Sequence, residues 1–266
     1  MKLQSYFNLS GSPFPKAITD EALLMNPALK QVMTRLHFAL ERDTIALLVA
    51  ESGCGKSTAL SLFAKSLDAA SYNILATSLT TLSPFSFIAS LGASTGLPGR
   101  RFKGESAASL LMHMRSQPKR TVILIDEAHL LPDDSLEDLR LLTADDLDRR
   151  SAFSLVLVGQ PLLRDRIAEP QHYALWQRIG VRLRLRPLTE DEIHLFLDRH
   201  MQAAGWRKKT SLFEPTAVTE IFHHSRGIPR LIQNIALDSM LTAMSAKKKT
   251  VDVEAVGQAI VDMDSV

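Results

Sequence analysis

Uninterrupted apolar runs occur at several places in the first two thirds of the chain, and amphipathic segments separate them. A run without polar alternation is typical of a strand buried on both faces, and such strands belong to parallel sheets. Strands that alternate with helices require right-handed crossovers, so the pattern predicts an α/β fold with a parallel sheet. We expect strands at residues 44–50, 71–79, 121–125 and 152–158, and helices at residues 56–67, 83–91, 105–116, 132–147 and 162–168.

The pattern changes close to Pro187. Residues 181–188 alternate strictly between apolar and polar positions, which indicates an edge strand with one solvent-exposed face. Helical periodicity dominates afterwards, starting with acidic residues directly after Thr189. We expect helices at residues 190–204, 216–225, 228–245 and 253–263. The domains predicted in this way are an N-terminal arm and helix over residues 1–43, an α/β domain over 44–188 and a small all-helical lid over 189–266.

The N-terminal arm has few periodic signals before Asn26. Asn26 and Pro27 form a good helix start, because a capping asparagine is followed by a proline in the first turn. We therefore expect a helix from this point to residue 41, and we expect the irregular arm before it to cover an edge of the sheet.

The composition is ordinary for a globular protein. Of 266 residues, 45% are hydrophobic and 23% are charged, and the formal net charge of +2 does not indicate a nucleic-acid partner by itself. The one cysteine, Cys54, excludes an internal disulfide and favours a reducing compartment. The N-terminus lacks the apolar core of a signal peptide, and the apolar runs are far shorter than the roughly 18 residues that span a bilayer. We expect a soluble, cytoplasmic protein without a membrane segment.

A glycine-containing loop follows the first predicted strand and leads into the helix that starts near Lys56. This order of strand, loop and helix is the setting of a phosphate-binding loop, because Gly53 and Gly55 let backbone N–H groups approach an anion that the helix dipole also attracts. Lys56 would reach the β- and γ-phosphates, and the Ser57 hydroxyl would ligate Mg²⁺. The residues expected to bind the nucleotide are Glu51, Ser52, Gly53, Cys54, Gly55, Lys56, Ser57 and Thr58.

Ala50 stands at the position of the motif's first glycine. Alanine is tolerated there if its φ angle is negative, as at an ordinary strand end. The alternative interpretation is a glycine-rich turn between a strand and a helix, but the complete strand–loop–helix pattern favours a phosphate loop.

Polar residues follow two of the predicted strands. Asp126 and Glu127 come directly after the strand at residues 121–125, at the edge where ligands bind in open α/β sheets. Asp126 would hold Mg²⁺ through water and Glu127 would orient the attacking water; the alternative is a solvated acidic turn. Gln160 follows the strand at 152–158 and is a candidate phosphate sensor, unless it only lies in a turn. His129 completes a DEAH tetrapeptide, but no further helicase motif is present.

These features together resemble an AAA+ ATPase. Residues 122–129, 157–161, 177–179 and 227–230 further resemble the ExeA-like group, which includes the DNA-transposition ATPases of the MuB and TnsC type. The resemblance covers nearly the whole chain. It implies a P-loop NTPase core with a small C-terminal helical lid, and it implies ATP hydrolysis with Mg²⁺.

The resemblance also implies roles for single residues. Gln160 matches the first sensor, and Arg230 matches a second sensor that reaches the γ-phosphate from the lid. Arg178 matches the finger that an adjacent subunit inserts, although three neighbouring arginines compete with it. Each of these arginines has an alternative as an ordinary surface residue. Ala144 departs from the pattern, because relatives usually place asparagine there. The competing arginines are Arg164, Arg166 and Arg182.

An arginine supplied by a neighbour makes hydrolysis depend on assembly, so the resemblance implies a homo-oligomer, either a ring or a helical filament. Its expected function is to regulate transposition: the oligomer coats double-stranded DNA and recruits a transposase and a target-selection protein. The alternative is a secretion ATPase that acts on envelope assembly. Secretion relatives continue into a membrane segment and a cell-wall-binding region, whereas this sequence ends at Val266, which favours the DNA function. The Asp126–Glu127 pair argues against a scaffold that binds ATP and barely hydrolyses it.

Basic residues suited to DNA lie between the second and third core strands. We expect residues 92–104 to form a loop that carries Arg100, Arg101 and Lys103. These residues would contact the DNA backbone, since a filament must tolerate any sequence. Lys119 and Arg120 are second choices, and the alternative for all of them is ordinary solvated loop charge.

Overall fold

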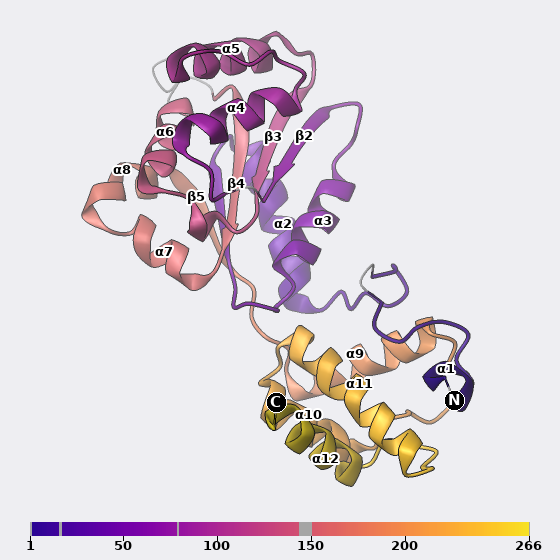
Figure 1. The fold of residues 1–266 in the computed structure, drawn as a ribbon. Helices are drawn as coiled ribbons and strands as arrows, with labels where there is room; N and C mark the ends of the chain where they lie inside the picture. The colour runs from indigo at the N-terminus through magenta and orange to yellow at the C-terminus, as the bar shows by residue number, and fades with distance from the viewer. Residues whose placement is uncertain (1, 16–17, 79, 144–150, 266) are drawn as a thin grey trace. The chain divides into compact units, whose positions relative to one another are not determined.

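The computed structural model describes residues 2–15, 18–78, 80–143 and 151–265. The chain divides into two compact units (Figure 1). The first, called here the sheet unit, is Ala28–Leu185, and the second, the helical unit, combines Met1–Pro27 with Arg186–Val266. The division just before Pro187 coincides with the change of pattern in the sequence.

The sheet unit is built on a five-stranded parallel sheet with the order β2-β3-β4-β1-β5. The inner strands β1, β3 and β4 are buried almost throughout, as their uninterrupted apolar runs predict. Strand β5 lies at the edge and alternates between buried and exposed residues, which confirms the prediction from its alternating sequence. The strands are β1 (Ile45–Val49), β2 (Tyr72–Thr77), β3 (Arg120–Ile125), β4 (Phe153–Gly159) and β5 (Ile179–Arg184).

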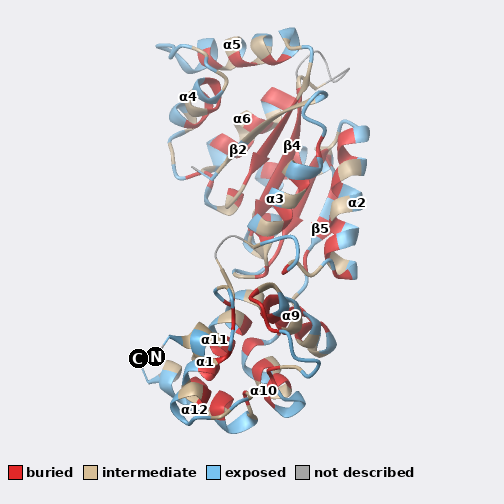
Figure 2. Ribbon diagram, turned by 90° about the vertical axis from the view of Figure 1, so that its right-hand side faces the viewer, coloured by how far each residue is buried: buried red, intermediate tan, exposed pale blue. Residues whose placement is uncertain are grey.

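Helices cover both faces of this sheet (Figures 1 and 2). One face packs against α4 (Pro84–Ser94), α5 (Lys103–Ser116), α6 (Asp133–Thr143), α7 (Pro161–Ile167) and α8 (Tyr173–Arg178). On the opposite face lie α2 (Pro27–Glu41) and α3 (Lys56–Ser66). Two short 3-10 helices, η1 (Ala128–Leu130) and η2 (Pro170–His172), connect elements at the edges. The predicted α/β class is therefore confirmed.

Some predicted boundaries differ from the structure. The expected loop over residues 92–104 is shorter, because α4 continues to Ser94 and α5 begins at Lys103. Gly104 lies in the first turn of α5, and because glycine usually marks a turn or loop, the sequence predicts a later start for this helix. Helix α6 ends at Thr143, and Ala144 with the rest of the helix expected to residue 147 lies outside the described residues.

The helical unit contains the predicted helices within one or two residues. They are α9 (Glu190–Ala203), α10 (Pro215–Ser225), α11 (Pro229–Ser245) and α12 (Val253–Asp264). Helix α9 starts with a capping box, in which the Thr189 side chain accepts from the Glu192 backbone and the Glu192 side chain accepts from the Thr189 backbone. The capping box thus explains Glu192, one of the acidic residues that the sequence shows in this first turn.

The N-terminal arm belongs to the core of the helical unit, so the expectation that it covers an edge of the sheet is wrong. Its weak periodicity does not predict this placement. It contains a short helix, α1 (Leu3–Tyr6), and its Phe7 and Leu9 side chains are buried in the apolar core of the four helices. The backbone N–H groups of Ser10 and Gly11 both donate to the Ala204 carbonyl at 2.9 Å. The arm is thus an integral part of this unit.

His200 on α9 lies between the arm and the helices. Its ring centroid is 5.0 Å from that of Phe14 and 4.5 Å from that of Phe196, and neither ring nitrogen has a hydrogen-bond partner among the described residues. Burial lowers the pKa of His200 to about 4. Between about pH 6.5 and 4 the unfolded chain therefore binds more protons than the folded one, and stability falls as the pH falls.

We predict that His200→Leu removes this pH dependence. From pH 7 to pH 5, the wild type should lose about 2 kcal/mol of unfolding free energy that the variant does not lose. Urea unfolding at both pH values measures the difference. His223→Leu, on the exposed face of α10, is the matched control and should behave like the wild type. Parallel stability curves for the wild type and His200→Leu would contradict the prediction.

Candidate nucleotide-binding site

The loop between β1 and α3 has the backbone of a phosphate cradle. Gly53 and Gly55 adopt φ angles of 80° and 90°, a left-handed region that other residues enter at a cost. Gly55 caps α3 without a side-chain bond, so the first N–H groups of this helix stay available to an anion. Ala50 is buried at the strand end and is not among the described non-glycine residues with positive φ, as its replacement of glycine requires.

Two side chains of the loop, those of Lys56 and Cys54, are also compatible with a bound anion. The Lys56 side chain is buried, and its Nζ atom donates to the carbonyls of Ala50 and Glu51 at 3.1 Å each. The ammonium group is thus held against the loop that would surround the phosphates. Burial raises the pKa of the Cys54 thiol above its ordinary value, so the loop carries no thiolate that would repel a phosphate.

Ser57 and Asp126 connect the phosphate loop to the end of β3. The Ser57 hydroxyl donates to Asp126 Oδ2 at 2.7 Å, and Asp126 Oδ1 accepts from the Glu127 backbone N–H at 2.9 Å. A hydroxyl and a carboxylate are ligand types that Mg²⁺ prefers, so these residues fit the ion. Among the described residues no group of three or more His, Cys, Asp or Glu side chains could hold a metal.

Glu127 has an unusual backbone. Its φ and ψ angles of 52° and 33° place it in the left-handed region, which is uncommon for a residue with a side chain. Its carboxylate is partly exposed and lies 3.4 Å from Nδ1 of His129. Asp126 and Glu127 therefore point to different partners, as expected for neighbouring carboxylates with separate tasks.

Gln160 lies at the same edge of the sheet. It is the N-terminal cap residue of α7, directly after β4, and β4 pairs with both β1 and β3. The chain that follows β4 therefore leaves the sheet between the phosphate loop and Glu127. The segments that carry the predicted lysine, hydroxyl, carboxylates and amide thus leave the ends of three neighbouring parallel strands at the same edge of the sheet.

Arg178 lies at the other end of the strands, where their amino ends meet. It ends α8 just before β5, and its carbonyl accepts from Thr44 Oγ1 at 3.2 Å. It also lines a cavity of about 110 Å³ whose other walls include Asp43, just before β1, and Phe153, the first residue of β4. Strand β1 separates this end from the phosphate loop by about 13 Å, from a rise of roughly 3.3 Å per residue.

The three competing arginines have partners within the chain. Arg164 pairs with Asp165 at 2.6 Å. Arg182 lies over the Trp176 ring at 3.9 Å and donates to the Trp176 carbonyl at 2.7 Å. Arg166 donates to the backbone after Glu127, a contact without any signal in the sequence because it joins segments 35 or more residues apart. Arg230 belongs to the helical unit, where it is exposed in the first turn of α11.

The basic residues proposed for DNA separate into two groups. Arg100 and Arg101 are exposed between α4 and α5, and neither makes an ion pair among the described residues; Arg101 lies over the ring of Phe102 at 5.5 Å. Lys103 is part of α5 and pairs with Asp138 at 2.9 Å. The second choices are engaged internally: Lys119 donates to the Ala69 carbonyl at 2.8 Å, and Arg120 contacts Ser154 and Asp43.

The fold and the site are those of a P-loop ATPase of the AAA+ class. A family model described as an AAA domain matches residues 39–167. The chain is 32% identical to General secretion pathway protein A of Aeromonas hydrophila over 251 residues, which is 91% of this chain and 45% of that protein. It is 26% identical to the Mu-like prophage FluMu DNA transposition protein B of Haemophilus influenzae over 184 residues, 67% of this chain and 61% of that protein. The chain thus spans about half of the length of these curated relatives.

Solved structures show the same fold. The Orc1 protein of Aeropyrum pernix in complex with DNA aligns with a TM-score of 0.70 at 18% identity, covering 92% of this chain and 68% of that one. Cdc6p of Pyrobaculum aerophilum aligns with a TM-score of 0.66 at 20% identity, covering 93% and 68%. The RuvB Holliday junction branch migration motor of Thermotoga maritima aligns at 0.59 with 22% identity, covering 87% and 68%. No helix in the described part of the chain is long and apolar enough to cross a membrane.

We predict that Asp126→Asn lowers the affinity for ATP in the presence of Mg²⁺ by about 10- to 100-fold. The amide keeps the shape of the side chain, and its oxygen can still accept from the Glu127 N–H, but it removes the negative charge. Titration with a fluorescent ATP analogue, with Mg²⁺ or with EDTA, measures the effect, and the affinity in EDTA should not fall. Asp134→Asn, at an exposed position of α6, is the control. An unchanged Mg²⁺ dependence in Asp126→Asn would contradict this role.

Proposed function

We propose that the chain hydrolyses ATP to ADP and phosphate at the carboxyl edge of its sheet. The observation that carries this proposal is the 2.7 Å contact between Ser57 and Asp126, because it brings the phosphate loop to the strand end that bears Glu127. The phosphate chain would lie on the N–H groups of the loop with Lys56 against its β- and γ-phosphates. Ser57 and Asp126 would hold Mg²⁺, which when bound neutralises charge on the phosphate oxygens.

The remaining residues act on the attacking water and on the γ-phosphate. Glu127 would orient the water for in-line attack, and its partly exposed carboxylate is open to that water. Gln160 would donate its side-chain amide to a γ-phosphate oxygen from the end of β4. Arg230, in the first turn of α11, would be the second sensor of the γ-phosphate. Positioning and charge neutralisation supply most of the catalysis in phosphoryl transfer, so small displacements of these groups matter.

Hydrolysis would require a second copy of the chain. Arg178 lies at the amino edge of the sheet, on the far side of β1 from the phosphate loop, and therefore does not reach the loop of its own chain. In a ring or helical filament, the amino ends of the strands in one copy would face the carboxyl ends in the next copy. Arg178 would then reach the γ-phosphate of the neighbour. ATP would then favour the assembled state, and hydrolysis would release it.

We further propose that the assembled ATPase acts in the cytoplasm on double-stranded DNA, as a regulator of transposition that recruits a transposase and a target-selection protein. Similarity to the FluMu DNA transposition protein B supports this function. The exposed pair Arg100 and Arg101 also supports it, because their charges are not neutralised by acidic side chains among the described residues. Such loop arginines suit the phosphate backbone, and binding would be independent of base sequence.

A secretion function is the second candidate. The higher identity to General secretion pathway protein A, over a longer part of the chain, favours it. In that case the same ATPase unit would act on envelope assembly, and the basic loop between α4 and α5 would have no nucleic-acid partner. Binding to DNA separates the two candidates.

We predict that the wild type binds random-sequence duplex DNA with ATP and Mg²⁺, and that replacing Arg100 and Arg101 by alanine weakens this binding. The loss should be similar across sequences, and the slope of log affinity against log salt should fall by about 2, one for each lost phosphate contact. Lys103→Ala should have a smaller effect, because Asp138 already neutralises this lysine. Fluorescence anisotropy over a range of salt concentrations measures both quantities.

Replacing Arg207 and Lys209 by alanine, both exposed in the helical unit, provides the matched control. If the wild type does not bind DNA with or without ATP, the transposition function is wrong and the secretion function is favoured. If the wild type binds and the double variant binds equally well, the DNA site lies elsewhere.

A further inference from the structure

We propose that Arg166 is a positioning residue for Glu127, which it holds in place by clamping the backbone after Glu127 to helix α7. This inference rests on the proposed role of Glu127 in ATP hydrolysis. Arg166 would thus act on the site of its own chain and not as an arginine finger in the site of a neighbour.

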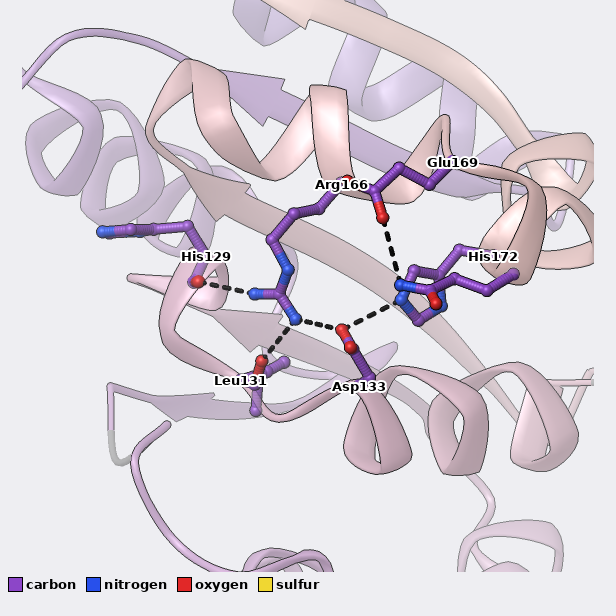
Figure 3. A network of polar contacts seen from close by, with 7 residues as sticks. His129, Leu131, Asp133, Arg166, Glu169 and His172 are labelled. Atoms are coloured by element: carbon purple, nitrogen blue, oxygen red, sulfur yellow. Dashed lines mark hydrogen bonds and ion pairs between the residues drawn. The ribbon is translucent and has the colours of Figure 1, made fainter.

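The contacts of Arg166 form a three-way clamp (Figure 3). Its Nη1 atom donates to the His129 carbonyl at 2.8 Å, and its Nη2 atom donates to the Leu131 carbonyl at 2.9 Å and also contacts Asp133 Oδ1. The acceptors belong to η1, to the residue that caps its end and to the first residue of α6, whereas Arg166 lies on α7. The planar guanidinium suits such a set, because its donors diverge at fixed angles, which an ammonium cannot reproduce.

Asp133 is itself held from a second side. The Nε2 atom of the buried His172 lies 3.0 Å from Asp133 Oδ1 (Figure 3). Hydrogen bonds from Arg166 first, and then from His172, hold the pKa of the Asp133 carboxyl below its ordinary value. The carboxylate therefore stays charged at neutral pH and strengthens the contact with the guanidinium.

The clamp acts on the segment that carries the strained residue. Glu127 has its left-handed backbone directly before η1, and its carbonyl accepts from Leu130 N at 3.0 Å. Strained backbone persists only where the surroundings determine it on both sides. Asp126 Oδ1 holds the N–H of Glu127 on one side, and Arg166 fixes the carbonyls two and four residues further along.

The clamp also sets the spacing between Glu127 and Gln160. A side chain at Gly159 would lie 2.9 Å from Leu163 and 3.2 Å from the His129 nitrogen, so only glycine lets the end of β4 approach η1 this closely. Gln160 starts α7, and Arg166 lies on the same helix. One guanidinium thus fixes the strand end that bears the proposed water-orienting carboxylate relative to the strand end that bears the proposed phosphate sensor.

This geometry separates Arg166 from the candidates for an arginine finger. A finger must leave its own chain to reach a neighbour's phosphate, and the Arg166 guanidinium is engaged with three acceptors of its own sheet unit. Breaking these contacts would leave two backbone carbonyls without their donor. Its role is therefore within the chain.

We predict that Arg166→Lys lowers the turnover number for ATP about 10- to 100-fold, as a misplacement on the order of 1 Å does, and leaves ATP affinity within about two-fold of the wild type. Steady-state hydrolysis and titration with a fluorescent ATP analogue measure the two effects. Arg140→Lys is the matched control, because Arg140 makes a comparable two-pronged pair with Glu137 on α6, away from η1. The control should keep wild-type turnover.

A double-mutant cycle with Glu127→Gln tests whether Arg166 acts through Glu127. In single-turnover measurements, Arg166→Lys should not reduce the residual hydrolysis of Glu127→Gln further. A multiplicative loss would overturn the inference, and so would normal turnover of Arg166→Lys beside an inactive Glu127→Gln. If Glu127→Gln hydrolyses ATP like the wild type, the proposed function of Glu127 falls first, and the inference falls with it.

Asp133→Asn provides a second variant in case Arg166→Lys does not fold. It preserves the shape of the acceptor and removes its charge, so we expect a loss of turnover in the same direction but smaller, again without a loss of ATP affinity. Wild-type turnover in a folded Asp133→Asn protein, judged by circular dichroism, would count against the clamp.

Discussion

The common direction of the strands is the constraint on which the rest of the structure depends. Because all five strands are parallel, their carboxyl ends meet at one edge of the sheet, and the segments that leave β1, β3 and β4 are brought together there. Lys56, the two carboxylates and Gln160 are far apart in sequence but share that edge. The same polarity places Arg178, which precedes a strand, at the other end of the strands, which is why we propose that a second copy completes the site.

The buried charge of Lys56 and the strained backbone of Glu127 are stable at this edge because hydrogen bonds connect the surrounding loops. Lys56 is buried and donates to two loop carbonyls, and Glu127 has a left-handed backbone. Both arrangements would be costly in an isolated loop. The bond from Ser57 to Asp126 joins the phosphate loop to β3, and the contacts of Arg166 join the segment after β3 to α7. Gln160 caps the start of α7, so the segments that carry Ser57, Asp126, Glu127 and Gln160 form one connected set.

Much of this could be predicted from the sequence, because the signals are local. Uninterrupted apolar runs identified the inner strands, alternation identified β5 as an edge strand, and Thr189 with its acidic neighbours marked the start of α9. Other features depend on tertiary contacts. Helix α8 has six residues, too few for a periodic pattern, and Gly104 concealed the start of α5. The arm and the Arg166 clamp bring together segments with no pattern in common, and only the folded chain shows them.

A mixing experiment with two inactive variants tests the account most directly, since it asks whether one site is completed across two copies. Glu127→Gln should bind ATP and assemble without hydrolysis, and Arg178→Ala should keep an intact carboxyl edge but lack the arginine for its neighbour. Each variant alone should be inactive. An equimolar mixture should recover about a quarter of wild-type turnover if copies mix at random in a head-to-tail assembly. Full turnover by Arg178→Ala alone, or a mixture that stays as inactive as its components, would contradict the account.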